Sequence, residues 1–149
     1  MSETTEARNL LFDLYTQTDN PRLRATLAPV AMDPAGFGRR FYERLFEFSP
    51  GLRRLFPADL SMQQLKVAQM LCLLVGGLDE PDALLPTLHA LGESHRGFGA
   101  KPAHYFAVGE AMIETLAELN GAAFDDEARA SWQRLYGFIA REMQRGERR

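Results

Sequence analysis

Apolar residues recur at helical spacing through most of the chain. One stripe steps along the sequence by three or four positions, which places its members on one face of a helix; they are Phe37, Phe41, Leu45 and Phe48. The same spacing predicts four further helices, marked by Val67, Met70, Leu71 and Leu74; by Leu84, Leu88 and Leu91; by Tyr105, Val108, Met112, Leu116 and Leu119; and by Ala128, Trp132, Leu135, Ile139 and Met143. No segment alternates apolar and polar residues as a half-buried strand does, so the chain is predicted to be all-α.

Local signals place the ends of the last two predicted helices. Pro102 suits the first turn of a helix, because no amide proton is needed there. Asn120 and Gly121 tolerate the left-handed backbone conformation that ends a helix, and Asp125 or Asp126 can cap the next one. The eight prolines all lie within the first 102 positions, and we expect them to divide that part of the chain into short helical segments.

Residues 1–20 are predicted to be an extension of the domain, which we place at residues 21–149. Apolar residues at helical spacing between positions 10 and 15 are typical of a short amphipathic helix, and residues 16–21 of a turn. Two interpretations stay open. The segment is partly ordered, as chain termini commonly are, or it contacts a partner or a second copy of the chain.

The composition is that of one globular domain. With 149 residues, 46% of them hydrophobic and 25% charged, the chain can bury a core without the support of disulfides or metal ions. Its single cysteine, Cys72, excludes an intramolecular disulfide and a cysteine-rich zinc site. The net charge of −3 gives no field that attracts nucleic acid or anionic membranes, and the longest charge-free apolar stretch, residues 67–78, is too short to span a bilayer. The polar, acidic start is unlike a secretory signal, so we expect a soluble cytoplasmic protein without nucleic-acid or membrane partners.

His95 is a polar residue on an apolar face. It stands four positions after Leu91 and continues its stripe, so we expect it to face the same surroundings. The helix is expected to end directly afterwards, at Gly97. Spacing alone leaves two interpretations open: a core histidine with satisfied hydrogen bonds, or a ligand. His89 lies one position off the stripe and His104 in the first turn of the next helix, so both are expected at the surface or rim.

Tyr42 and Gln63 also fall on predicted inner faces. A buried hydroxyl or amide without a partner costs about 1–3 kcal/mol, so buried polar groups as a rule have partners. Either these two side chains bond to backbone or to each other, or something polar lies between them and His95.

No motif of a known catalytic centre is found. The sequence lacks a glycine-rich phosphate loop, an H-E-x-x-H zinc motif, a nucleophile elbow and a pair of carboxylates on one helix face. Glu142 and Glu147 stand among arginines near the end of the chain, and we expect them to be solvated charges.

Two segments resemble the globin family. Residues 41–46 (Phe-Tyr-Glu-Arg-Leu-Phe), followed by Pro50 and Phe56, resemble the second helix of bacterial haemoglobins and the turn after it. Residues 84–86, with the stretch from His95 to Glu110, resemble their proximal region. The chain is similar, from about residue 22 to 144, to single-domain bacterial haemoglobins and to the globin domain of flavohaemoglobins. The resemblance implies a globin fold, with helices crossing at about 50° around a pocket for haem b.

On the proximal side, the resemblance implies that His95 is the axial ligand of the haem iron and that Tyr105 is the tyrosine of the proximal network. Phe56 matches the phenylalanine that packs on the haem face. The glutamate that completes this network in the family has its counterpart near Arg148 and Arg149. Electron donation through a strongly hydrogen-bonded imidazole is therefore not expected, nor is strong peroxidase-like behaviour.

On the distal side, Tyr42 and Gln63 match the polar pair of the family. Gln64 is the alternative to Gln63, because the family varies in length through the preceding loop. Val67 matches the apolar residue one turn beyond, and Lys66 falls where it can reach a haem propionate, a contact worth about 0–1 kcal/mol.

The resemblance implies a protein that binds dioxygen, NO or CO at ferrous haem iron. A hydroxyl and an amide aimed at dioxygen stabilise its partial negative charge, which implies slow release. The chain ends at Arg149 without a reductase segment, so an external reductase is expected to return the iron to the ferrous state. Two alternatives stay open: an NO dioxygenase working with that reductase, and a haem-based gas sensor or adaptor module. We expect a monomer or a homodimer.

Overall fold

The computed structural model describes residues 19–97 and 101–147. Within these ranges the chain is helical and has no strand, which confirms the predicted all-α class. The elements, in chain order, are α2 (Asp19–Met32), α3 (Pro34–Phe48), the 3-10 helix η1 (Pro50–Leu55), α4 (Ser61–Gly76), α5 (Pro81–Gly97), α6 (Pro102–Asn120), the 3-10 helix η2 (Gly121–Ala123) and α7 (Asp126–Glu147). The helix expected between residues 10 and 15 lies outside the described residues.

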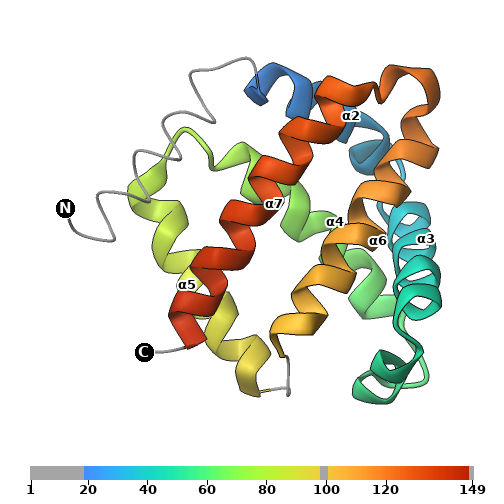
Figure 1. The fold of residues 1–149 in the computed structure, drawn as a ribbon, viewed down its shortest axis with the longest axis vertical. Helices are drawn as coiled ribbons and strands as arrows, with labels where there is room; N and C mark the ends of the chain where they lie inside the picture. The colour runs from blue at the N-terminus through green and yellow to red at the C-terminus, as the bar shows by residue number, and fades with distance from the viewer. Residues whose placement is uncertain (1–18, 98–100, 148–149) are drawn as a thin grey trace.

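Helix α7 holds several of the other helices together. Figure 1 shows it crossing the front of the molecule, with α2 beside its first turns and α5 beside its last ones. Helix α3 packs against both α4 and α6. Each of these helices contributes a large side chain that is fully buried in the common core; they are Leu23, Phe37, Leu71, Leu88, Leu116 and Trp132. The apolar stripes of the sequence therefore meet in one core.

Several predicted helix ends are confirmed. Helix α6 begins at Pro102 and ends at Asn120, and Gly121 after it has a φ of 60°, in the left-handed region that favours glycine. The carboxylate of Asp125 accepts a hydrogen bond from the backbone N–H of Ala128 at 2.8 Å and so caps α7. In the same way Asp33 caps α3 by accepting from the N–H of Gly36 at 3.1 Å.

The expectation that every proline interrupts a helix is wrong at two positions. Pro29 lies inside α2 and Pro86 inside α5. A proline within a helix removes one backbone hydrogen bond, at a cost of about 3 kcal/mol. Helix α5 continues because its leucine face is buried against the rest of the core at Leu84 and Leu88, and that packing offsets the lost bond.

Two glycines let helices approach each other backbone to backbone. A Cβ atom on Gly38 of α3 would lie 2.0 Å from the carbonyl oxygen of Gln64 in α4. A Cβ atom on Gly92 of α5 would lie 1.7 Å from the carbonyl oxygen of Met143 in α7. Any side chain at either position would force the helices apart, so these glycines fix where the two helix pairs cross.

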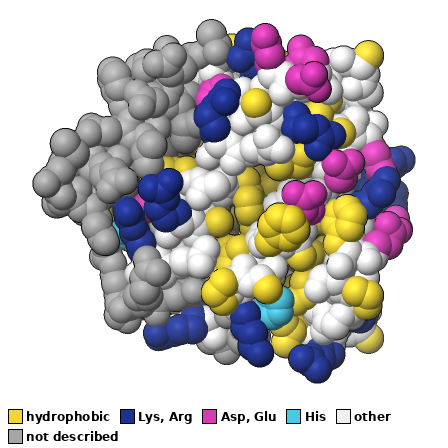
Figure 2. Space-filling model, in the orientation of Figure 1, with side chains coloured by type: hydrophobic (Ala, Val, Ile, Leu, Met, Phe, Trp, Pro, Cys, Tyr) yellow, Lys and Arg dark blue, Asp and Glu magenta, His cyan; other side chains and the backbone are white. Residues whose placement is uncertain are grey.

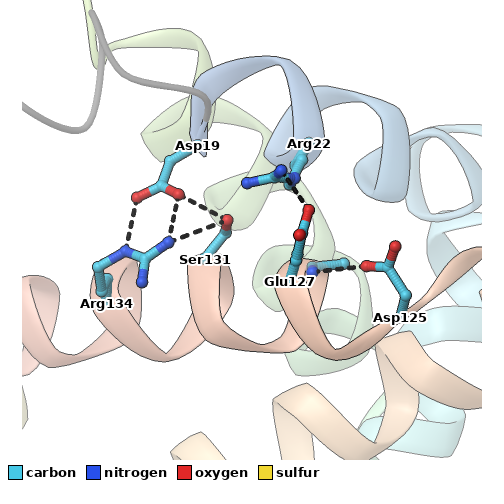
Figure 3. A network of polar contacts seen from close by, with 7 residues as sticks. Asp19, Arg22, Asp125, Glu127, Ser131 and Arg134 are labelled. Carbon is cyan, nitrogen blue, oxygen red and sulfur yellow. Dashed lines mark hydrogen bonds and ion pairs between the residues drawn. The ribbon is translucent and has the colours of Figure 1, made fainter.

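The start of α2 is tied to α7 by a polar network (Figure 3). The buried carboxylate of Asp19 accepts hydrogen bonds from Ser131 and Arg134. Deeper in the core, the indole N–H of Trp132 donates to the hydroxyl of Thr26 at 2.7 Å. The turn expected over residues 16–21 is therefore wrong for residues 19–21, which form the first turn of α2; the other three lie outside the described residues.

Apolar side chains also reach the surface. Figure 2 shows them gathered on the front face of the molecule, between α6 and α7, with charged side chains around them. Phe48, the last member of the α3 stripe and the last residue of that helix, is 47% exposed. None of the described helices combines the length and the hydropathy that a membrane crossing requires.

Candidate functional site

Three aromatic side chains form one cluster at the end of α3 and the turn after it. The ring of Tyr42 meets that of Phe56 edge-on, with the ring centres 5.4 Å apart, and lies 5.9 Å from that of Phe46. The rings of Phe46 and Phe56 are 5.7 Å apart and also meet edge-on. Such edge-to-face contacts add about 0.5–1.5 kcal/mol per pair to the burial of the rings. The structure thus brings together two sequence-predicted site residues, Tyr42 and Phe56.

The hydroxyl of Tyr42 makes no hydrogen bond with another described residue; the side chain as a whole is 8% exposed, and its hydroxyl oxygen is not fully enclosed. Burial raises the pKa of Tyr42 to about 12, because the surroundings disfavour the charged phenolate. The phenol therefore keeps its proton at every physiological pH. The sequence left two interpretations open for Tyr42. The first, a hydrogen bond to the backbone or to Gln63, is not found in the described part of the chain.

Helix α4 carries the other residues expected on the distal side. The backbone of Gln64 lies against Gly38 of α3. Gln63, the residue before it, points to a neighbouring face of α4. Val67 follows it by four positions and shares that face; both side chains are half-buried, and Val67 packs against the core. Lys66 is exposed, as a residue at the rim of a site must be.

The structure places His95 in the last turn of α5, where it is exposed to solvent. Its leucine stripe is buried at Leu84 and Leu88 and half-buried at Leu91. The expectation that His95 has the same surroundings as Leu84 and Leu88 is therefore wrong, because the core that covers the earlier turns of this face does not extend to the last one. A core histidine, the first of the two interpretations from spacing, is excluded.

One hydrogen bond fixes the chemistry of the His95 ring. Its Nδ1 lies 2.7 Å from the backbone carbonyl oxygen of Leu91. A carbonyl oxygen can only accept, so Nδ1 carries the proton and donates. In the neutral imidazole the lone pair is then on Nε2, the atom available to a metal. A backbone carbonyl that holds the other ring nitrogen in this way is the usual support of a metal-bound histidine.

Tyr105 lies in the first turns of α6 and is buried. Its backbone carbonyl accepts a hydrogen bond from the hydroxyl of Tyr136 in α7 at 2.5 Å. Gly109, one turn later, makes room for the Tyr136 ring, since a Cβ there would lie 2.5 Å from it. These two contacts hold α6 against α7 close to Tyr105, the residue that the resemblance to globins assigns to the proximal network.

The two groups of candidate residues belong to different helices. Tyr42 lies in α3, Gln63 and Val67 lie in α4, and Phe56 directly follows η1, whereas His95 belongs to α5, whose main neighbour is α7. The structure therefore assembles the aromatic cluster by direct contact, and it leaves His95 with an exposed ring on another helix.

Sequence reasoning placed one buried carboxylate at the surface. Glu142, expected to be a solvated charge, is 1% exposed, and its carboxylate lies 3.0 Å from Nε2 of His89 and 2.8 Å from the guanidinium of Arg145. The prediction is wrong because α5 covers this side of α7. A signal was available: Glu142 follows Ile139 by three positions and adjoins Met143, so it borders the apolar stripe of its helix.

The remaining histidines lie at the edge of the fold. His89 is 17% exposed, and His104 is half-buried and accepts a hydrogen bond from the backbone N–H of Lys101 at 3.0 Å. Neither has the arrangement of His95, in which one ring nitrogen is held by a carbonyl of its own helix and the ring is exposed.

Comparison with known proteins gives the family. The globin family model matches residues 39–143. The chain is 31% identical over 114 residues to a flavohemoprotein of Rhodopirellula baltica and 28% identical over 121 residues to one of Chromobacterium violaceum, alignments that cover 74% and 79% of this chain. A flavohemoprotein of Bacillus thuringiensis subsp. konkukian is 33% identical over 104 residues, or 68% of this chain.

The similarity covers only part of each relative. The alignments take in 28%, 30% and 25% of the length of these three flavohemoproteins, in the same order. The matched region nevertheless includes Tyr42, the residues of α4, His95 and Tyr105, which are the candidate residues described above. The chain belongs to the globin family.

Proposed function

We propose that this protein is a haem b globin that reversibly binds dioxygen, and also NO, at ferrous iron. Its family supports haem binding and the binding of gaseous ligands in general. The observation that carries the proposal is the state of His95: an exposed imidazole whose Nδ1 is occupied by the carbonyl of Leu91, which leaves Nε2 as a metal ligand.

The residues present fit a haem. His95 would be its axial ligand, Phe56 and Val67 would pack against its faces, Tyr105 would lie beside the proximal imidazole, and Lys66 would pair with a propionate at the rim. When bound, the haem supplies a ferrous iron that binds diatomic gases. The side chains named here would hold the group and set its orientation.

Tyr42 and Gln63 would act as hydrogen-bond donors on the distal side. The haem would supply a site for a ligand that carries partial negative charge when bound, and a phenol and an amide directed at that ligand would stabilise it. Each bond to a charged group is worth about 1.5–3 kcal/mol, and two of them slow ligand loss by roughly a hundredfold or more. A mostly buried Tyr42 whose hydroxyl makes no hydrogen bond with another described residue, and so is available as a donor, supports this role.

Absorption spectra of the purified protein test the proposal. We expect the oxidised, reduced and carbonmonoxy forms each to give the spectrum of a haem protein, and the reduced form to bind dioxygen reversibly. A protein that is colourless as purified and takes up no added hemin would contradict the proposal.

A second candidate function is NO dioxygenation, in which ferrous haem carrying dioxygen oxidises NO to nitrate. The similarity to flavohemoproteins favours it. A reductase would have to restore the ferrous iron for each cycle. Consumption of many equivalents of NO in the presence of a supplied reductase supports this activity, whereas a single turnover under the same conditions supports a binding protein.

A further inference from the structure

Glu142 of α7 is a buried carboxylate that the proposed gas binding does not use. Oε1 of its carboxylate lies 3.0 Å from Nε2 of His89 in α5, and Oε2 accepts a hydrogen bond from Arg145 at 2.8 Å. Desolvating a carboxylate costs several kcal/mol unless donors surround it. Here both oxygens have a partner, His89 and Arg145. The His89–Glu142 contact joins two helices across 53 positions of the sequence.

The same two helices touch most closely at a neighbouring point. Gly92 of α5 lies directly against the backbone carbonyl of Met143, the residue after Glu142. Helix α5 packs mainly against α7, and these two contacts lie about one helical turn apart in that interface. Packing at Gly92 sets how closely the two helices approach, and the His89–Glu142 contact adds a directional restraint beside it.

His89 and His95 stand three residues before and three residues after Gly92. At 1.5 Å per residue, each is about 4.5 Å along the helix axis from the crossing point. Because α5 is a continuous helix, a displacement at His89 is transmitted along it towards His95. The contact with Glu142 is therefore coupled to the direction of the His95 imidazole.

We propose that Glu142, acting through His89, is a positioning residue that sets the tilt of α5 and with it the direction in which His95 presents Nε2. The inference rests on the proposed function, because it assumes that His95 ligates haem iron. Glu142 itself does not contact the haem. Its effect is mechanical: a charged hydrogen bond on one side of the crossing point holds the imidazole on the other side.

Two substitutions of His89 separate this role from simple stabilisation. Leucine at position 89 cannot donate to Glu142, whereas the amide of glutamine can place a donor close to where Nε2 of the imidazole lies. We expect His89→Leu to shift the iron–imidazole stretching frequency of the ferrous haem protein, measured by resonance Raman spectroscopy. It should also speed amide hydrogen exchange in α5 about tenfold, the effect of losing one hydrogen bond to a charged group. His89→Gln should restore both quantities to near the wild-type values.

Glu114→Gln is the matched control. Glu114 of α6 pairs with Arg129 of α7 at 2.9 Å, a contact between helices that does not involve α5. This variant should leave the stretching frequency and the exchange of α5 unchanged. A His89→Leu protein that melts earlier, yet keeps the wild-type frequency and α5 exchange, would overturn the proposal and leave Glu142 a purely structural residue.

Failure of the proposed function gives a different result. If the wild-type chain takes up no haem, the assignment of His95 as a ligand fails in the wild type itself. Hydrogen exchange in α5 of the purified chain then still decides whether the contact restrains the helix: faster exchange in His89→Leu alone supports the restraint, and equal exchange in all variants overturns it.

Discussion

The guanidinium of Arg134 donates two hydrogen bonds to the carboxylate of Asp19, from Nε to Oδ2 at 2.7 Å and from Nη2 to Oδ1 at 2.5 Å. The two residues are 115 positions apart. The hydroxyl of Ser131 donates a further hydrogen bond to Oδ1 at 2.6 Å. This paired geometry is stronger than that of a single contact, and it attaches the first turn of the described chain to α7.

Replacing Asp19 should weaken the fold. Asp19→Asn keeps the size of the side chain but removes its charge and one acceptor oxygen. We expect the free energy of unfolding to fall by about 1.5–3 kcal/mol, the value of a hydrogen bond to a charged group, as measured by urea denaturation at pH 7. Glu127→Gln, which removes the exposed ion pair with Arg22, should cost less than about 1 kcal/mol. Equal losses in both variants would contradict the role given to Asp19.

The same carboxylate should make stability depend on pH. The hydrogen bond from Arg134 holds the pKa of Asp19 below its usual value of 3.8. The stabilisation is therefore fully present above pH 3.8 and is lost as the pH falls through the lower pKa of the folded chain. We expect the difference in unfolding free energy between wild type and Asp19→Asn to shrink in acid. A difference that stays constant down to pH 2 would rule out this linkage.

Local signals in the sequence were sufficient to predict most of the helices. The predictions that proved wrong depend on contacts between segments that are distant in the sequence. Pro102 and Gly121 act through their own backbone, so their effect on α6 could be predicted. Pro86 fits inside α5 because of packing that local rules do not include. Glu142 is buried by α5, a helix some fifty positions away, and no property of its own neighbours requires that partner.

The same distinction between local signals and distant contacts applies to the candidate site. Residue types and spacing singled out His95 and Tyr42 as polar groups on apolar faces, and the resemblance to globins gave them roles. The exposure of His95 could not be predicted from its stripe, because periodicity gives the direction of a side chain but not how far the core extends along a helix. The hydrogen bond to the Leu91 carbonyl likewise appears only once α5 is built.

Tyr42→Phe should speed the release of dioxygen. The substitution keeps the ring and its contacts with Phe46 and Phe56 but removes the hydroxyl donor. We expect the oxygen dissociation rate, measured by stopped flow, to rise at least about tenfold, because one hydrogen bond to a partly charged ligand is worth about 1.5 kcal/mol or more. Release of carbon monoxide, which carries less charge, should change less.

The wild-type oxygen dissociation rate should also be insensitive to phenol ionisation between pH 6 and pH 10, since burial raises the pKa of Tyr42 to about 12. A rate that is the same in wild type and Tyr42→Phe would remove Tyr42 from the site.

His95→Ala should abolish stable haem binding. Without the imidazole no described residue of α5 offers a comparable ligand, because His89 is engaged with Glu142. We expect the purified variant to lack the haem absorbance band of the wild type. His104→Ala is the control: that ring accepts a backbone hydrogen bond at the start of α6, and its loss should leave the band intact. A normal haem spectrum in His95→Ala would reject the ligation.

Two glycine-to-alanine substitutions should move stability in opposite directions. At Gly92 the added methyl group would lie 1.7 Å from the Met143 carbonyl oxygen, so α5 and α7 must separate. We expect a loss of about 1–3 kcal/mol, the cost of overpacking a close contact. At Gly137, inside α7, nothing lies within 4 Å of the new atom, and alanine should stabilise the helix by about 0.4–1 kcal/mol. Thermal and urea unfolding of the two variants, compared with wild type, measure both effects. A Gly92→Ala protein as stable as wild type would mean that the α5–α7 crossing is not fixed at this glycine.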